Sequence, residues 1–217
     1  MSIENLNLIE LQKFESLIPE LAGFASRLLV KTYDNFIRVL YQDIDEVISL
    51  IQENSETRIK DSEDRLTIEI IGLLRRSGYN ATHDAKIGGH ADIVIRKKDF
   101  IWIGEAKIYD GCEYIWQGFL QLTTRYSIGD SNQKDGGILI YIKNNNNARS
   151  VMEGWAKHLF QKNLPQYFYS SCESRANCFF SIHEHDKSGN PFKVRHMPIM
   201  LFFSPQDKSG LSSKKKS

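Results

Sequence analysis

Two apolar runs separated by a short charged turn constrain the fold of this chain more than any other feature. The runs cover residues 93–95 and 100–106, and residues 97–99 between them are Lys-Lys-Asp. Short runs of β-branched and aromatic residues with alternating side chains favour strands, and charged residues between two such runs favour a tight turn. The sequence therefore predicts two neighbouring, paired strands.

Charged side chains gather at one end of this predicted pair. Asp92 directly precedes the first run, and Glu105 closes the second. Lys107 follows Glu105 by two positions, so both side chains leave the same face of a strand. Asp92 and Glu105 are expected on adjacent strands, close to one another.

Two carboxylates held together need a proton or a cation between them. At a separation of about 4 Å they repel by ~4 kcal/mol at an effective dielectric constant near 20. Carboxylate oxygens with open coordination positions favour Mg²⁺, and a nearby lysine can hold a water or a charged oxygen. The group therefore points to metal-assisted hydrolysis of a phosphodiester.

Asp92, followed by Glu105-Ala106-Lys107, resembles the core signature of the PD-(D/E)XK nuclease superfamily. The resemblance implies a restriction-endonuclease-like fold and a Mg²⁺-dependent deoxyribonuclease, with Mn²⁺ as a substitute. In that family pattern Asp92, Glu105 and the carbonyl of Ala106 bind the metal, and Lys107 orients the attacking water. Ala91 stands where many members have proline. The plain alternative is a solvated hairpin end with an ion pair between Glu105 and Lys107.

Residues 61–77 are expected to form a helix, since capping and acidic residues open the segment and Gly78 follows it. The resemblance implies that a glutamate of this helix completes the metal ligands. Glu63 is favoured over Glu69 because its face and spacing agree with the strand residues. A solvated helix acid is the alternative for either glutamate.

A second helix is expected over residues 113–126, after the metal-binding strand. The resemblance suggests that Gln121 and Arg125 contact the nucleic-acid backbone, or that Gln121 orients Lys107. Many superfamily members carry Gln-x-x-x-Tyr here, whereas Gln121 and Tyr126 are one residue further apart. This departure leaves the equivalence open, and a surface amide is the alternative for Gln121.

The remaining pattern indicates an α/β fold, a mixed central sheet flanked by helices. Residues 138–142 form a nearly unbroken apolar run, as buried central strands do. Further expected elements are a short strand within 79–86, a helix over 148–161 and a hairpin from residues 179–182 and 194–203.

The N-terminal part differs in charge from the rest. Residues 1–56 carry 4 basic and 10 acidic side chains, and residues 57–217 carry 24 and 17, which together give the net charge of +1. We therefore expect an N-terminal helical region (1–56), a nuclease domain (57–204) and a basic, disordered tail (205–217). Periodicity predicts a buried face on the N-terminal helices, but leaves open whether the sheet or a partner covers it.

Composition excludes some classes of protein. No apolar run approaches the ~18 residues that span a membrane. The three cysteines show no paired ligand spacing, which favours a reducing compartment, with the cytoplasm as the default. His183, His185 and His196 have no cysteine or carboxylate pattern to complete a transition-metal site.

The expected function is that of an endonuclease acting on DNA, in a bacterial restriction or antiphage system. One alternative is a non-catalytic scaffold of the same fold, which binds a second copy or a partner ATPase through its acidic helices. Another is a ribonuclease, because the residues themselves indicate only a phosphodiester.

Overall fold

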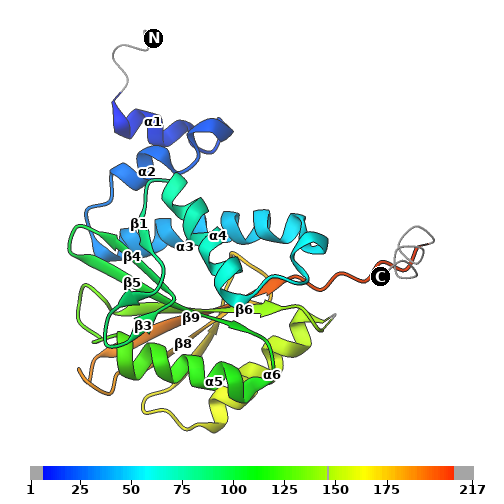
Figure 1. The fold of residues 1–217 in the computed structure, drawn as a ribbon. Coiled ribbons are helices and arrows are strands. Elements are labelled where there is room, and N and C mark those ends of the chain that lie inside the picture. The colour runs from blue at the N-terminus through cyan, green and yellow to red at the C-terminus, as the bar shows by residue number, and fades with distance from the viewer. Residues whose placement is uncertain (1–6, 146, 208–217) are drawn as a thin grey trace.

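A mixed seven-stranded β-sheet forms the centre of the computed structural model, which describes residues 7–145 and 147–207 (Figure 1). The strand order is β1-β4-β5-β6-β9-β8-β7, and β2 and β3 form a separate two-stranded sheet. The strands are β1 (Asn80–Thr82), β2 (Ala85–Lys86), β3 (His90–Ala91), β4 (Ile93–Lys97), β5 (Phe100–Ile108), β6 (Asp135–Ile142), β7 (Phe168–Ser171), β8 (Phe179–Glu184) and β9 (Pro191–Met200).

Parallel pairing is confined to the middle of the large sheet. β6 runs parallel to β5 and to β9, and the other neighbouring strands pair antiparallel. Every residue of β6 is buried. Its unbroken apolar run predicted this central position, and the predicted hairpins β4–β5 and β8–β9 are also present. The α/β class and the mixed sheet are confirmed.

Helices cover both faces of the sheet (Figure 1). They are α1 (Leu8–Phe14), α2 (Phe24–Leu28), α3 (Tyr33–Glu53), α4 (Glu63–Arg76), α5 (Cys112–Leu120) and α6 (Ala148–Gln161). α3 and α4 lie on one face, and α5 and α6 lie on the other. Side chains of β6 alternate between the two sides: Leu139 and Tyr141 pack under α3 and α4, whereas Ile138 and Ile140 pack on α5 and α6.

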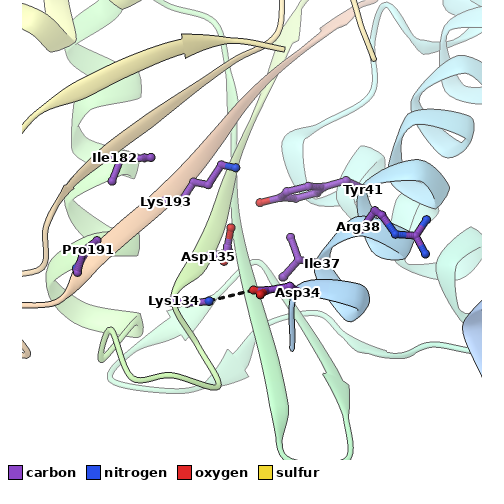
Figure 2. A pocket seen from close by; sticks show the side chains of 9 residues that line it. All are labelled: Asp34, Ile37, Arg38, Tyr41, Lys134, Asp135, Ile182, Pro191 and Lys193. Carbon is purple, nitrogen blue, oxygen red and sulfur yellow. Dashed lines mark ion pairs between the residues drawn. The ribbon is translucent and has the colours of Figure 1, made fainter. Parts of the chain in front are cut away.

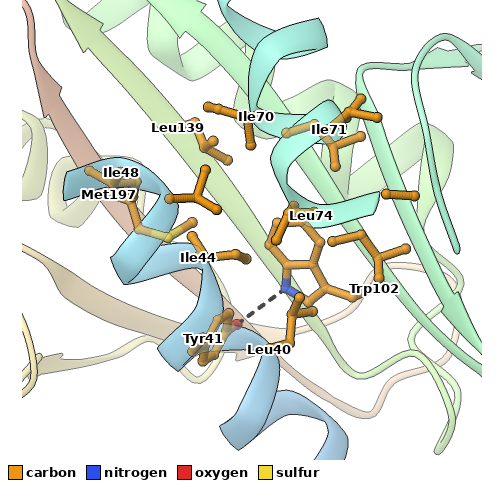
Figure 3. Close-up of a cluster of buried hydrophobic side chains, with 14 of the residues drawn as sticks. Leu40, Tyr41, Ile44, Ile48, Ile70, Ile71, Leu74, Trp102, Leu139 and Met197 are labelled. Carbon is orange, nitrogen blue, oxygen red and sulfur yellow. Dashed lines mark hydrogen bonds between the residues drawn. The ribbon is translucent and has the colours of Figure 1, made fainter. Parts of the chain in front are cut away.

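Trp102 of β5 lies at the centre of the core beneath α3 and α4 (Figure 3). Its indole N–H donates to the Tyr41 hydroxyl of α3 over 3.4 Å. α3 also buries Leu40, Ile44 and Ile48 in the same cluster. The sheet therefore covers the apolar face of α3, whereas α1 has no buried residue.

Two local expectations need correction, and one strand was missed. The strand expected within 79–86 is divided into β1 and β2, which belong to different sheets, and Asp84 between them has a positive φ of 53°. The helix expected over 113–126 ends as an α-helix at Leu120 and continues as the π-helical turn η4 (Gln121–Tyr126). β7 was not predicted.

Within the described part of the chain, no helix combines the length and apolar character needed to cross a membrane. Of the tail expected over 205–217, residues 208–217 lie outside the described residues.

Candidate functional site

The edge of β5 next to β4 loses its strand partner before β5 ends, because the pairing with β4 stops at Gly104. Beyond it the N–H of Ala106 donates to the Asp92 carboxylate over 2.9 Å, and the N–H of Ile108 donates to the Glu63 carboxylate over 2.7 Å. Two carboxylates thus replace a strand as acceptors, which satisfies the backbone and fixes both side chains. The Ala106 carbonyl leaves the strand at this same edge.

The ammonium group of Lys107 lies among three carboxylates. Its Nζ is 2.7 Å from Glu105 Oε1, 3.5 Å from Glu63 Oε1 and 4.0 Å from Asp92 Oδ2. These acids come from β5, from the start of α4 and from the residue before β4. The structure therefore brings together the four side chains that the sequence singled out.

Glu63, rather than Glu69, is the acid of α4 that reaches this group. It is the first residue of the helix, behind the N-cap Ser62. One turn further on, the hydroxyl of Thr67 lies 3.0 Å from that of Tyr141 on β6, which anchors this end of α4 over the sheet. Glu69 instead forms an ion pair with Arg58 at 2.5 Å.

The three acids differ in their access to solvent. Glu105 is 1% exposed, whereas the side chains of Glu63 and Asp92 retain 25% and 22% of their exposure. Glu105 Oε2 is buried and has no hydrogen-bond partner. The ion pair of the plain alternative is present, but it accounts neither for this oxygen nor for the two further acids.

Burial and mutual repulsion shift the pKa values of these groups. Burial, reinforced by the charge of Asp92, raises the pKa of Glu105 to about 8. Burial also raises the pKa of Glu63, against the hydrogen bond from Ile108. For Lys107, burial favours the neutral amine, but the surrounding carboxylates, with Glu105 first, outweigh it and raise its pKa. The lysine is therefore held as a cation.

Helix α5 approaches the site through a glycine that the sequence analysis did not identify. A Cβ atom on Gly118 would lie 3.0 Å from Lys107 Cε and 3.3 Å from Glu105 Cγ. These contacts are tighter than usual, so an alanine there would require the two strand side chains to shift by a few tenths of an ångström. From the same helix the ring of Tyr114 comes within 5.8 Å of the ammonium. A glycine inside an apolar helix was the only signal available for this close approach.

Gln121 and Arg125 lie on η4, beside the site rather than in the carboxylate group. Among the described residues, the Lys107 ammonium contacts the three acids and the Tyr114 ring, and Gln121 is not one of its partners. Arg125 is exposed.

The π-helical turn bears on the spacing of Gln121 and Tyr126. In a π-helix the hydrogen bonds run between residues five apart, as from the N–H of Ser127 to the carbonyl of Leu122. Residues five apart in a π-helix therefore lie on roughly the same side of the helix, as residues four apart do in an α-helix. Gln121 and Tyr126, which are five residues apart, therefore lie about one turn apart on η4.

The three C-terminal histidines serve the packing of β8 and β9. Both ring nitrogens of His196 are hydrogen-bonded, to the Trp155 indole at 3.0 Å and to the Ser181 hydroxyl at 2.8 Å. His185 bonds the Ser127 hydroxyl at 2.8 Å. His90, near the site in sequence, pairs with Asp84.

The chemistry of the acids fits a divalent cation. All donors are hard oxygens, and the unpartnered oxygen of Glu105 offers a free lone pair. Among the described residues no three His, Cys, Asp or Glu side chains are already arranged as a metal-binding group. The Lys107 ammonium supplies the positive charge where these acids converge. Comparison of the chain with protein-family models, with curated proteins and with solved structures found no match.

Proposed function

We propose that this protein is a Mg²⁺-dependent nuclease that hydrolyses phosphodiester bonds of DNA. The observation that carries the proposal is the convergence of Glu63, Asp92 and Glu105 on Lys107, with one buried carboxylate oxygen left unpaired. Glu63, Asp92, Glu105 and the carbonyl of Ala106 would hold the metal.

A purely structural role explains this arrangement poorly. A buried polar atom without a partner costs about 1–3 kcal/mol, and a buried ion pair is seldom better than apolar packing. If all three acids were ionised around one lysine, this partly buried place would carry a net charge of −2, and the raised pKa of Glu105 reflects burial together with that repulsion. A divalent cation would balance that charge and use the free oxygen of Glu105.

Bound Mg²⁺ would act as a Lewis acid and lower the pKa of a water. The protein side chains supply the rest of the chemistry. Lys107 has three N–H donors and lies next to Glu63 and Asp92, the two acids with access to solvent. In the proposed mechanism it would donate to a phosphate oxygen and stabilise negative charge that develops there. Exposed Arg125, and Gln121 on the same turn, are proposed contacts to the nucleic-acid backbone.

The test is cleavage of supercoiled plasmid by the pure protein with Mg²⁺, with Mn²⁺ and with EDTA. We expect cleavage with either metal and none with EDTA. Lys107→Ala and Asp92→Asn should each lower the rate by at least about 100-fold, since the first removes the cation that stabilises developing charge and the second removes a proposed metal ligand. Glu69→Gln is the matched control, because it neutralises an acid of the same helix outside the group. Cleavage at the parental rate by either site variant contradicts the assignment.

A specific observation favours the scaffold as a second candidate. Ile9 and Leu17, in the N-terminal helical region, are 62% and 73% exposed. Such a surface fits docking to a second copy or a partner ATPase. Titration calorimetry with Mg²⁺ separates the two candidates, because a scaffold has no need of the ion. Parallel digests of duplex DNA, single-stranded DNA and RNA then decide between deoxyribonuclease and ribonuclease. A cytoplasmic role in defence belongs to the proposal by analogy only.

A further inference from the structure

Cys172 and Cys178 face each other at the end of the β7–β8 hairpin. The register pairs Ser171 with Phe179, so the next opposed pair is Cys172 and Cys178. The N–H of Cys172 donates to the carbonyl of Cys178 over 3.2 Å. The reciprocal bond is absent, because the N–H of Cys178 donates to the carbonyl of Arg175. Cα atoms of directly opposed residues on antiparallel strands are about 4.5–5.5 Å apart, within the ~4.4–6.8 Å that a disulfide spans. Both side chains pack on the same side of the sheet, against the core under α3.

The sulfur of Cys172 lies against a buried cation. Arg195 Nη2 is 3.2 Å from this sulfur, and the Ser174 hydroxyl is 3.4 Å from it. Arg195 is 0% exposed and also pairs with Asp45 of α3 at 2.8 Å, so its position is fixed. A guanidinium this close stabilises a thiolate over a thiol.

The three cysteines therefore differ in reactivity. Burial acts to raise the pKa of Cys172, but Ser174 and Arg195 outweigh it and the pKa is lowered. Burial raises the pKa of Cys178 to about 12 and also raises that of Cys112. Cys172 is partly exposed, Cys178 is 5% exposed, and both line one surface pocket. This is the arrangement of an attacking thiolate with a second thiol in reach.

We propose that Cys172 is a peroxide-reactive thiol that Cys178 resolves into an intramolecular disulfide. The Cys172 thiolate attacks one oxygen of hydrogen peroxide: an S–O bond forms, the O–O bond breaks, and hydroxide leaves to become water with the proton the thiol has released. The Cys178 sulfur then attacks the Cys172 sulfur. An S–S bond forms, the S–O bond breaks, and the hydroxyl leaves as water with the proton of Cys178. Two thiols are oxidised and one peroxide is reduced to two waters.

The disulfide would alter a contact between the hairpin and α3. In the reduced protein Ser174 and Arg175 of the connecting loop bond to Asp45, and Arg195 joins this group. Closing the bond takes the negative sulfur away from Arg195 and fixes the ends of the loop. This inference does not depend on the proposed nuclease activity.

The test is a peroxide titration of the full, reduced chain, followed by digestion without reductant and mass spectrometry. We expect a Cys172–Cys178 peptide that has lost two hydrogens, with Cys112 still reduced. In Cys178→Ala, dimedone should trap a sulfenic acid on Cys172. In Cys172→Ser, Cys178 should stay reduced. Cys112→Ser is the matched control and should oxidise like the parental protein.

A measurement on the unaltered chain guards against variants that fail to fold. At neutral pH, iodoacetamide should modify Cys172 about ten times faster than Cys112 in the folded protein, and at similar rates in urea. Ser174→Ala should slow the reaction of Cys172 a few-fold, because one donor to the thiolate is lost. Faster reaction of Cys112, a disulfide between two chains, or equal oxidation of Cys172→Ser would overturn the proposal.

Discussion

The Glu105 carboxyl is almost entirely buried in β5, yet it carries the unpaired oxygen of the site. We predict that Glu105→Gln abolishes Mg²⁺-dependent cleavage but changes the free energy of unfolding by less than about 1 kcal/mol. The amide keeps the shape of the side chain, and Lys107 keeps Glu63 and Asp92 as partners, so no charge is left unpaired. Urea unfolding and the plasmid assay measure the two effects. A loss of several kcal/mol would show that the ion pair is mainly structural.

Asp135 offers a test of burial away from the site, at the pocket between α3 and the sheet (Figure 2). Burial raises its pKa from 3.8 to about 6, although Lys193 and Lys134 oppose the shift, with a smaller contribution from Asp34 in the same direction as burial. The folded state therefore binds this proton more tightly than the unfolded state. Stability from this group is fully present below about pH 4 and is lost as the pH rises through about 6.

We accordingly predict that Asp135→Asn stabilises the protein at pH 8, by at most about 3 kcal/mol for a shift of roughly two units. The gain should shrink as the pH falls and vanish only well below 3.8, where the parental side chain is protonated in both states. Thermal unfolding of both proteins across this pH range measures it. A gain that does not depend on pH would mean that the substitution acts through packing.

At the scale of elements, α5 packs closely on the Lys107 and Glu105 side chains of β5 at Gly118, which has no side chain of its own. We predict that Gly118→Ala costs about 1–3 kcal/mol of stability, since its Cβ would press on Lys107 and Glu105. Gly72→Ala in α4 is the matched control: its Cβ would meet nothing within 4 Å, so helix propensity alone should stabilise by roughly 0.5–1 kcal/mol. Chemical unfolding of the two variants gives opposite signs if the close approach is real. Equal changes in stability for the two variants would show that the packing of α5 on β5 tolerates a side chain at position 118.

How far the sequence predicted each element depended on whether its signal was local. The β4–β5 hairpin, the buried β6 and the acid of α4 followed from alternation, an unbroken apolar run and helix spacing. The π-helical turn η4 could not be predicted, because the residues that form a π-helix are the same types that form an α-helix. In the structure, the hydroxyls of Thr123 and Thr124 also donate there to carbonyls four residues earlier. Gly118 was missed because its role depends on a strand distant in sequence.

At the scale of the whole molecule, the helices of the acidic N-terminal part differ in burial: α3 belongs to the core, whereas α1 has no buried residue. Periodicity predicted a buried face on its helices but not what covers that face. The long helix α3 proves to be a layer of the sheet domain: Tyr41 donates to the carbonyl of Gly136 and packs edge-on against Trp102. The elements on the two sides of the charge boundary near residue 56, α3 and α4, thus share one hydrophobic core. The boundary does not separate two folding units.

The division between α1 and α3 leads to a prediction for truncated chains. A chain beginning at Ala22 should remain folded and keep any cleavage activity, because α1 buries no residue. A chain beginning at Ser55 should fail to fold, because it lacks the whole of α3 and would uncover the cluster around Trp102. Each buried aliphatic side chain lost from that cluster costs about 2–5 kcal/mol, so the loss of α3 exceeds the total stability of an ordinary domain. Circular dichroism and thermal unfolding of the two chains measure this. A cooperative transition in the shorter chain would mean that the sheet and the remaining helices form a core without α3, and that the N-terminal helices are a separate docking module.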